Sequence, residues 1–370
     1  MTTFQQKVKL LQGLLMGEIA HTGPFYATVD VTCRCNIHCV CCLYHSSLLN
    51  IPSDGNKAIK DIPYDLFKRL CNELKAMGTR QIILCGDGEP FLHPRLFDLI
   101  SVAKDAGFHV MLFTNGTLLE EARLKYLIDL RLDILKVSIF ASSPEEYKKN
   151  YPIDSPANYR KVVDGLKLLA HYKAEKKSKL PLVTLCHPIN KNNFQHIDAM
   201  VNWVYTTGCN AISFSPHHPF RGKYTTLSLS QAEEESVIFS LNKIKKQLNS
   251  LSIDHNIKQV LRRYKIGEVV WEKLPCYIGW LHATIKMDGM VLPCCRCDLP
   301  MGNLNEKQFH EIWNNSAYRT FRRKALTCKG LESMVKQCDC NFCGYVGDNV
   351  RVHNIFRWVR PFSFNLRREK

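Results

Sequence analysis

Four cysteines lie within eight positions in the segment CNIHCVCC, which runs from Cys35 to Cys42. In it, Cys35, Cys39 and Cys42 have a Cys-x3-Cys-x2-Cys spacing, with which a compact loop can turn three thiolates towards one point. Three thiolates can hold a cubane iron–sulfur cluster and leave one iron open for a further ligand. They can also join a distant cysteine or histidine around zinc. The spacing excludes Cys41 from the triplet, and we expect Cys41 and Cys33 to bind no metal.

A second pattern, GDGEP at residues 86–90, follows another apolar segment. Its glycines allow the backbone to approach a ligand closely, and its amide groups together with Glu89 could hold the ammonium and carboxylate groups of an amino acid. On its own the pattern is an ordinary turn. Next to a three-cysteine loop on the preceding predicted strand, it indicates a binding site.

Cysteines become dense again from Cys276 onwards, in a module where we expect little regular secondary structure. The segment 285–294 predicts a β-hairpin with an Asp-Gly turn, which delivers Cys294 near Cys276, and CNFC supplies Cys340 and Cys343. Four thiolates complete a cubane cluster, and zinc accepts the same ligands. The remaining cysteines leave a further cluster arithmetically open: Cys295, Cys297, Cys328 and Cys338.

These residues need a scaffold, and an alternation of strands and helices supplies it. Apolar β-rich segments are separated by helical patterns that end at glycine, which indicates parallel βα units. We therefore expect an α/β fold, a partial (β/α)6 TIM-like barrel with a small cysteine-rich C-terminal domain. Chemistry in such barrels sits at the C-terminal ends of the strands. The predicted strands are 25–31, 80–86, 109–115, 134–140, 180–186 and 210–215.

The composition limits the classes of function. Lys and Arg outnumber Asp and Glu by 50 to 34, a formal net charge of +16, which favours anionic partners such as nucleic acid, phosphorylated small molecules or an acidic membrane surface. We find no nucleic-acid-reading motif, no apolar run of membrane-spanning length and no signal peptide. We therefore expect a cytoplasmic protein whose 17 cysteines bind metals rather than form disulfides.

The segments CNIHCVCC, CGDGEP, MLFTNGTLL and LKVSIFASSPEEY occur in this order, and together they resemble the radical S-adenosylmethionine (SAM) superfamily over about residues 25–220. The resemblance implies a [4Fe–4S] cluster held by Cys35, Cys39 and Cys42, with SAM on the fourth iron. One electron then cleaves SAM to methionine and a 5′-deoxyadenosyl radical, which abstracts a substrate hydrogen atom. Many members have glycine where this chain has Asp87. The implied SAM-binding residues are Gly86, Asp87, Gly88, Glu89, Pro90, Asn115 and Ser138.

The C-terminal module resembles the SPASM and twitch extensions of that superfamily. The matching features are the Cys-x12-Gly-x4-Cys hairpin, the segment GNLNEKQFHEIWNN and the late cysteines. The resemblance implies an auxiliary [4Fe–4S] cluster. No cysteine follows Cys343, so the shorter twitch arrangement with one protein-bound cluster fits better than a full SPASM pair. The implied ligands are Cys276, Cys294, Cys340 and Cys343.

The two resemblances imply a radical SAM oxidoreductase or maturase whose auxiliary cluster accepts an electron. Its substrate would be a small-molecule alcohol or a peptide, and a flavodoxin or ferredoxin would donate electrons. Alcohol oxidation also needs a base, for which His217, His218 and Arg221 follow the sixth strand; the alternative is a proline-bounded surface loop. The alternative functions are a SAM-dependent RNA or nucleotide modifying enzyme, which the charge would suit, and a non-enzymatic zinc protein.

The tail combines basic and aromatic side chains. This combination suits contact with an anionic membrane surface, or the aromatic residues pack back onto the barrel, and Pro361 limits any helix. The tail's residues of these types are Arg351, Phe356, Arg357, Trp358, Arg360, Phe362, Phe364, Arg367, Arg368 and Lys370. We divide the chain into an N-terminal extension (1–24), a radical SAM core (25–225), linker helices (226–275), a SPASM/twitch domain (276–345) and the tail (346–370).

Overall fold

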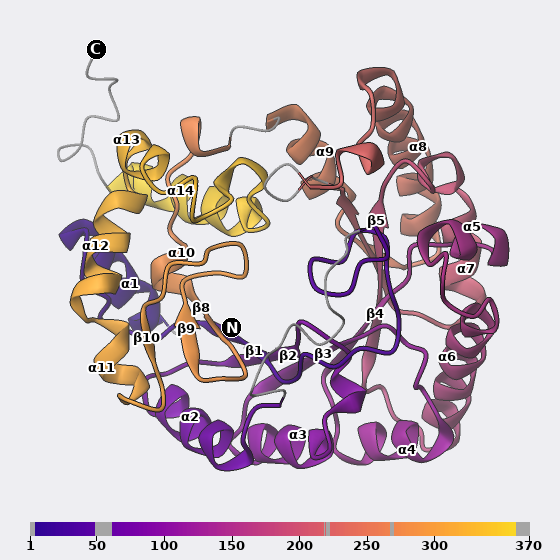
Figure 1. Ribbon diagram of the computed structural model, residues 1–370, viewed down its shortest axis with the longest axis horizontal. Coiled ribbons are helices and arrows are strands. Elements are labelled where there is room, and N and C mark those ends of the chain that lie inside the picture. The colour runs from indigo at the N-terminus through magenta and orange to yellow at the C-terminus, as the bar shows by residue number, and fades with distance from the viewer. Residues whose placement is uncertain (1–3, 49–60, 218, 220–222, 267–269, 360–370) are drawn as a thin grey trace.

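A single ten-stranded sheet connects the two cysteine-rich regions within the described residues. The strand order is β10-β9-β8-β1-β2-β3-β4-β5-β6-β7, and the neighbours from β8 to β7 are all parallel. Figure 1 shows the sheet curving inside a ring of helices. The computed structural model describes residues 4–48, 61–217, 219, 223–266 and 270–359.

The expected barrel strands are all present. The first six strands of the chain each overlap a predicted segment, which confirms the partial α/β barrel, and β7 adds a short seventh parallel strand. The strands are β1 (Tyr26–Asp30), β2 (Gln81–Cys85), β3 (His109–Thr114), β4 (Ile134–Ser138), β5 (Leu182–Ile189), β6 (Ala211–Pro216), β7 (Asp254–His255), β8 (His282–Ile285), β9 (Met290–Leu292) and β10 (Gly302–Asn303).

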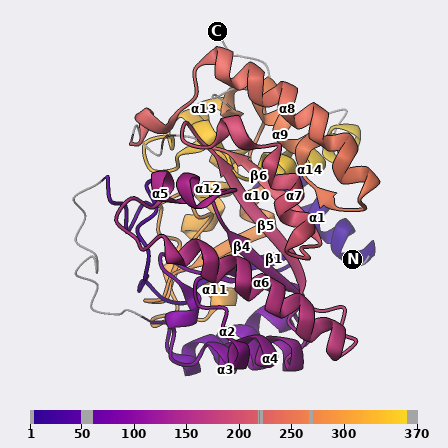
Figure 2. The same ribbon diagram turned by 90° about the vertical axis from the view of Figure 1, so that its right-hand side faces the viewer.

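Helices cover the outer face of the barrel, and Figure 2 shows α6, α7 and α8 on the outside of β4 to β6. Glycine ends α2 and α3 as predicted. Gly78 and Gly107, just beyond these two helices, have φ angles of 87° and 76°, which a residue with a side chain rarely adopts. The helices are α2 (Tyr64–Ala76), α3 (Leu96–Asp105), α4 (Glu121–Asp129), α5 (Pro144–Asn150), α6 (Ala157–Glu175), α7 (Ala199–Thr206), α8 (Gln231–Ser250) and α9 (Ile257–Ile266).

The C-terminal module is joined to the barrel through β8. This strand pairs in parallel with β1 from Tyr26↔His282 to Val29↔Ile285, and all four of its residues are buried. The predicted hairpin forms as β8 and β9, which pair antiparallel. The auxiliary module therefore extends the barrel sheet at β1, the strand that leads into the first cysteine loop.

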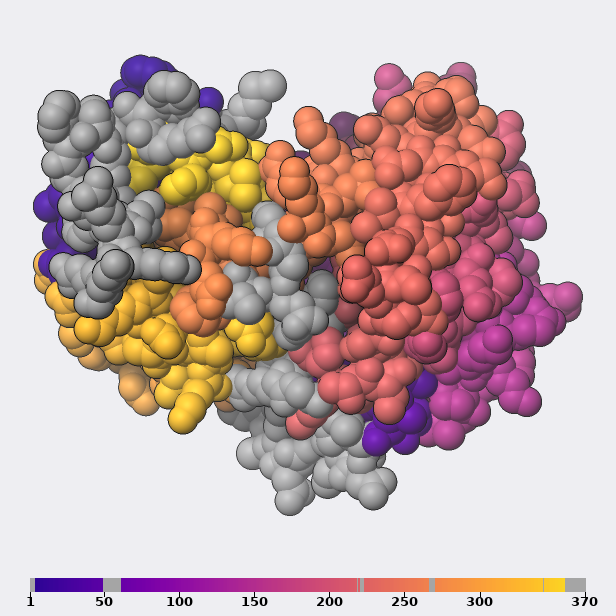
Figure 3. Space-filling model, turned by 90° about the horizontal axis from the view of Figure 1, so that it is seen from above, coloured from indigo at the N-terminus to yellow at the C-terminus, as the bar shows by residue number. Residues whose placement is uncertain are grey.

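The expectation of little regular structure in this module is wrong. Asn315 caps the N-terminus of helix α12, since its side chain accepts a hydrogen bond from the Tyr318 amide, and the helix buries Tyr318, Phe321 and Ala325. The segment of α12 contains no cysteine, so the density of cysteines in the module does not extend to this helix. Seen from above, the module and the helices α8 and α9 form opposite parts of the surface (Figure 3). The remaining helices are α1 (Phe4–Met16), α10 (Ile278–Leu281), α11 (Phe309–Trp313), α12 (Ser316–Ala325), α13 (Cys328–Glu332) and α14 (Val346–Val359).

Only the first part of the predicted tail lies in the described residues, where it forms α14. Phe356 is 2% exposed and packs edge-on against Tyr277, so this aromatic residue faces the protein. The tail residues from Arg360 to Lys370 lie outside the described residues. Among the helices in the described ranges, none has the length and apolar character needed to cross a bilayer.

Candidate active site and metal centres

The loop after β1 brings the three predicted cluster cysteines to the wall of one large cavity. Cys35, Cys39 and Cys42 all line it, and Cys41 does so as well, whereas Cys33 is buried beneath the loop. The amide of Cys42 donates to the carbonyl of Cys39 at 3.0 Å, which closes a tight turn. The structure therefore brings the triplet together.

Contacts from the barrel fix this loop. The amide of Val40 donates to the Asn150 carbonyl at 3.0 Å, the His38 amide donates to Asp154 Oδ2 at 2.7 Å, and the Tyr224 hydroxyl donates to the Cys42 carbonyl. The loop is thus held by segments that follow β4 and β6 as well as by its own turn.

The thiols of the loop are suited to a cation. Burial raises the pKa of Cys35 to about 12 and raises the pKa values of Cys39 and Cys42, and the neighbouring thiols raise that of Cys39 further. The amides of Tyr44 and His45 donate to Cys42 Sγ at 3.4 and 3.3 Å. Because a bound metal ion stabilises thiolates directly, this donor set fits an iron–sulfur cluster.

The GDGEP turn packs directly on the cysteine loop. The Glu89 amide donates to the Arg34 carbonyl at 2.7 Å. A Cβ atom on Gly88 would lie 2.1 Å from that carbonyl oxygen, and one on Gly86 would lie 2.5 Å from the Thr32 carbonyl oxygen. These positions therefore exclude any side chain, and the glycines serve contact between the two motifs.

Glu89 connects the turn to the end of β3. Its carboxylate accepts hydrogen bonds from Thr114 Oγ1 at 2.8 Å, from the Asn115 amide at 2.6 Å and from the Phe91 amide at 3.1 Å. Complete burial raises the pKa of Glu89 to about 7, although these hydrogen bonds lower it. The carboxylate thus organises the turn and the neighbouring strand end.

The cavity has a volume of about 1370 Å³ and runs the length of the barrel. The end near the cysteine loop carries polar groups, its walls include the apolar side chains of Ile83, Met111 and Phe113, and its other end reaches Leu11 of α1 and Ile355 of α14. All of the predicted SAM-binding residues line it, namely Gly86, Asp87, Gly88, Glu89, Pro90, Asn115 and Ser138.

The four predicted auxiliary ligands also come together. Cys276, Cys294, Cys340 and Cys343 line a small second cavity of about 30 Å³. Burial raises the pKa of Cys340 to about 12 and raises those of the other three, and neighbouring thiols, Cys295 among them, raise these pKa values further. In the described part of the chain, no three Cys, His, Asp or Glu side chains stand close enough to share one metal ion, and a cubane gives each thiolate its own iron.

Comparisons with known proteins identify the families to which the two cysteine-rich regions are similar. Residues 29–204 match the family described as the radical SAM superfamily, and residues 276–341 match SPASM, an iron–sulfur cluster-binding domain. The chain is a radical SAM enzyme with a C-terminal SPASM domain. Its cofactors are a [4Fe–4S] cluster with SAM and an auxiliary iron–sulfur cluster.

Two curated relatives cover most of the chain. The tungsten-containing aldehyde ferredoxin oxidoreductase cofactor-modifying protein of Pyrococcus furiosus is 23% identical over 80% of this chain and 83% of its own. The AdoMet-dependent heme synthase of Methanosarcina barkeri is 24% identical over 87% of this chain and 89% of its own.

Solved structures share the fold. Streptococcus suis SuiB bound to SAM superposes with a TM-score of 0.65 at 15% identity, covering 92% of this chain and 75% of SuiB. The AdoMet complex of anSMEcpe gives a TM-score of 0.61 at 18% identity, covering 82% of this chain and 84% of that one.

Of the three predicted base residues of the radical SAM enzyme, only His217 lies within the described residues. His217 follows β6, and its Nε2 lies 3.2 Å from the Tyr224 carbonyl oxygen, but it is not part of the cavity lining. Burial lowers its pKa. His218 and Arg221 lie outside the described residues.

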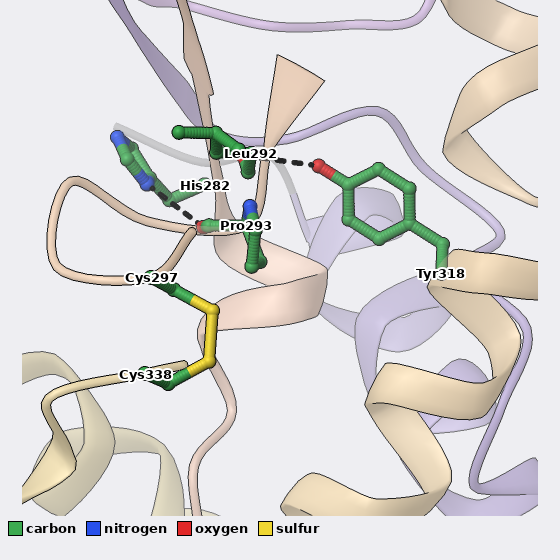
Figure 4. The surroundings of a disulfide bond; sticks show 6 residues. All are labelled: His282, Leu292, Pro293, Cys297, Tyr318 and Cys338. Atoms are coloured by element: carbon green, nitrogen blue, oxygen red, sulfur yellow. Dashed lines mark hydrogen bonds between the residues drawn. A yellow bond between two sulfur atoms is a disulfide. The ribbon is translucent and has the colours of Figure 1, made fainter. Parts of the chain in front are cut away.

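The expectation that the cysteines avoid disulfides is wrong at one pair, because Cys297 and Cys338 form a disulfide in the SPASM domain. Figure 4 shows it below the β8–β9 hairpin, near Pro293. The pair is 41 residues apart in sequence, and only the packing of the segment before Cys340 against the hairpin brings it together. Cys295 and Cys328 remain free thiols, and Cys295 lines the large cavity.

Sequence reasoning missed a group of charged side chains beside the GDGEP turn at residues 86–90, which is predicted to bind SAM and is called the SAM turn below. Lys286 Nζ, from the SPASM hairpin, bonds Asp87 Oδ1 at 2.5 Å and also bonds Asp30. It lies 5.3 Å from the centre of the Tyr44 ring. The available signals were an aspartate at a position where many family members have glycine and a lysine in the first strand of the predicted hairpin, and neither identifies its partner.

Proposed function

We propose that this radical SAM SPASM enzyme is an oxidoreductase or maturase that removes a hydrogen atom from a peptide segment or small molecule held in the large cavity. The substrate would then lose an electron to the auxiliary cluster and a proton to a basic side chain. The observation that carries this proposal is the shared cavity, because Cys42 lines it from one motif while Cys295 and Tyr345, which neighbour the ligands Cys294 and Cys343, line it from the SPASM domain.

The cavity has room for more than SAM. Single-ligand pockets typically measure about 300–1000 Å³, and this cavity measures about 1370 Å³. A substrate placed beside SAM would therefore lie between the two cysteine sites. This arrangement favours a substrate that is oxidised in two one-electron steps.

We assign separate roles to the cysteine loop, the GDGEP turn and the apolar wall of the cavity. Cys35, Cys39 and Cys42 would hold the first cluster, and the turn at 86–90 would bind SAM. When bound, these cofactors supply a carbon radical that takes a hydrogen atom from the substrate. The apolar wall formed by Ile83, Met111 and Phe113 would exclude water from the reacting carbon.

His217 stays our candidate for the base. Its lowered pKa keeps the ring neutral at pH 7, the form that accepts a proton. Because Nε2–H donates to the Tyr224 carbonyl, Nδ1 is the accepting atom in this assignment. Substrate binding would have to bring the departing proton to β6.

The names of relatives support both substrate classes. Structures of SuiB with its precursor peptide SuiA and of anSMEcpe with the peptide Kp18Cys favour a peptide. The names of the two curated relatives, a cofactor-modifying protein and a heme synthase, favour a small molecule. We propose a flavodoxin or ferredoxin as the electron donor and the cytoplasm as the compartment.

The test is anaerobic turnover with SAM, a low-potential reductant and candidate peptides or metabolites produced by neighbouring genes. A true substrate should stimulate formation of 5′-deoxyadenosine, and deuterium from the labelled substrate should appear in it. Cys294→Ala should still take up the deuterium but should release no oxidised product. Cys328→Ala, which alters an exposed thiol, is the matched control and should behave as wild type. Oxidation by Cys294→Ala at the wild-type rate would contradict electron transfer to the auxiliary cluster.

A further inference from the structure

A group of three charged side chains lies where the SPASM domain meets the SAM turn. The ammonium group of Lys286 contacts the carboxylates of Asp30, at the end of β1, and Asp87, in the middle of the turn. The side chains of Lys286, Asp30 and Asp87 are only 17%, 9% and 4% exposed. The three charges are therefore largely removed from water, with one more carboxylate than ammonium.

The lysine is held in place by the hairpin. Its amide donates to the Met290 carbonyl at 2.8 Å, and its carbonyl accepts from the Gly289 amide at 2.9 Å, so both backbone groups are used by the turn. The preceding residue, Ile285, pairs with Val29 of β1. Lys286 thus reaches the SAM turn from a fixed position on the neighbouring strand.

A buried ion pair contributes little net stability, because removing the charges from water costs about as much as their attraction returns. At this position the ion pair matters more for the geometry of the turn at 86–90 than for the stability of the protein. Asp87 stands between Gly86 and Gly88, which have no side chains and leave the backbone with unusual freedom. The contact with Lys286 fixes the middle of this segment, and Asp87 itself lines the cavity.

We propose that Lys286 is a positioning residue for SAM, which holds the turn at 86–90 in its binding geometry from the SPASM domain. The hairpin that delivers an auxiliary cluster ligand also fixes the SAM turn through one side chain. Docking of the SPASM domain and affinity for SAM are therefore coupled. This inference depends on the assignment of the 86–90 turn to SAM and not on the identity of the substrate.

The matched pair Asp87→Asn and Asp30→Asn tests it. Each variant removes one negative charge from the same lysine with little change in shape, but only Asp87 belongs to the SAM turn. In protein containing both clusters, we measure the dissociation constant of SAM by anaerobic equilibrium dialysis, together with the unfolding midpoint and the iron content. Asp87→Asn should weaken SAM binding about tenfold, the size expected for the loss of one hydrogen-bonded charged contact, and Asp30→Asn should change it less than about twofold.

Variants of Lys286 test the same proposal independently. Lys286→Met should weaken SAM binding as Asp87→Asn does, and Lys286→Arg should restore it, because a guanidinium can bridge two carboxylates. Equal SAM affinities in Asp87→Asn and Asp30→Asn, or wild-type affinity in Lys286→Met, would overturn the proposal. Since no substrate is present in these measurements, they stand whatever the turnover experiment finds.

Discussion

The two cysteine sites are built in opposite ways. The first is local, since its three thiols fall within eight residues of one loop, and the end of β1 positions them all. The second draws its four thiols from three places spread over nearly seventy residues: Cys276 lies just before α10, Cys294 just after β9, and Cys340 and Cys343 at a short 3-10 helix (Cys340–Phe342). The first site can be recognised from its spacing, whereas the second depends on tertiary packing.

Arg322 illustrates what the second site requires. This arginine is fully buried and donates from Nη2 to the Trp313 carbonyl at 2.7 Å and from Nε to the Gly279 carbonyl at 2.8 Å. It thereby ties α12 to α10, the helix that follows Cys276, and the Cys276 amide donates to the carbonyl of Ala325 at the end of α12. Cys276, a proposed ligand of the auxiliary cluster, is thus positioned through a helix that carries no cysteine.

The largest expected effect is on the local site. Cys35→Ala, Cys39→Ala and Cys42→Ala should each abolish reductive cleavage of SAM, because each removes one of the three proposed cluster ligands. Cys41→Ala is the control from the same loop and should retain most of the activity. The measurement is 5′-deoxyadenosine formed per protein under dithionite. Equal loss in Cys41→Ala would show that the ligands are assigned wrongly.

The next effect concerns the independence of the two sites. A variant with all three of these cysteines replaced by alanine should retain about four irons after reconstitution if the SPASM domain holds one cubane. Iron and sulfide analysis gives the number. About eight irons would indicate a second auxiliary cluster, which would have to open the Cys297–Cys338 disulfide or use other thiols. Zinc in place of iron would exclude a redox role for this domain.

A smaller effect should follow from crowding the contact between the cysteine loop and the GDGEP turn. Gly88→Ala places a methyl group 2.1 Å from the Arg34 carbonyl oxygen, so the turn must move, and we expect SAM cleavage to fall about tenfold with both clusters retained. Gly347→Ala is the control, since a Cβ atom there meets nothing within 4 Å. Wild-type kinetics in Gly88→Ala would mean that the cysteine loop and the turn can separate without cost.

The contrast between the sites also explains what could be predicted from the sequence. The barrel strands, the cysteine loop and the GDGEP turn are marked by patterns within a few residues of one another, and the structure has them as expected. The pairing of β8 with β1 was not predictable, because HATI is an apolar segment that could pair with any strand. The Lys286–Asp87 contact and the Cys297–Cys338 disulfide depend on that pairing or on the packing around the hairpin, so they were missed with it.

The smallest expected effect is on the pH dependence of stability, and it compares β8, which joins the SPASM domain to the barrel, with β5 of the barrel. His282 on β8 accepts from Thr28 Oγ1 at 2.8 Å and donates to the Pro293 carbonyl at 3.3 Å, and burial lowers its pKa to about 3. His187 on β5 contacts the Ile139 carbonyl at 3.0 Å, and burial lowers its pKa to about 4. Both rings are therefore neutral in the folded protein well below the pH at which an exposed histidine takes up a proton.

Whether stability rises or falls with pH depends on whether the folded or the unfolded state binds more protons. Below pH 6.5 the unfolded chain protonates each histidine while the folded protein does not, so their contribution to stability is present above pH 6.5 and is lost as the pH falls. Between pH 7.5 and 5.5 each should lower the free energy of unfolding by about 1.4 kcal/mol. Urea unfolding of His282→Asn and His187→Asn at these two pH values, at equal iron content, should show that each variant loses this amount of pH dependence. Loss in His187→Asn alone would mean that β8 separates from β1 before the barrel unfolds, so that the junction is not part of one cooperative unit with the barrel.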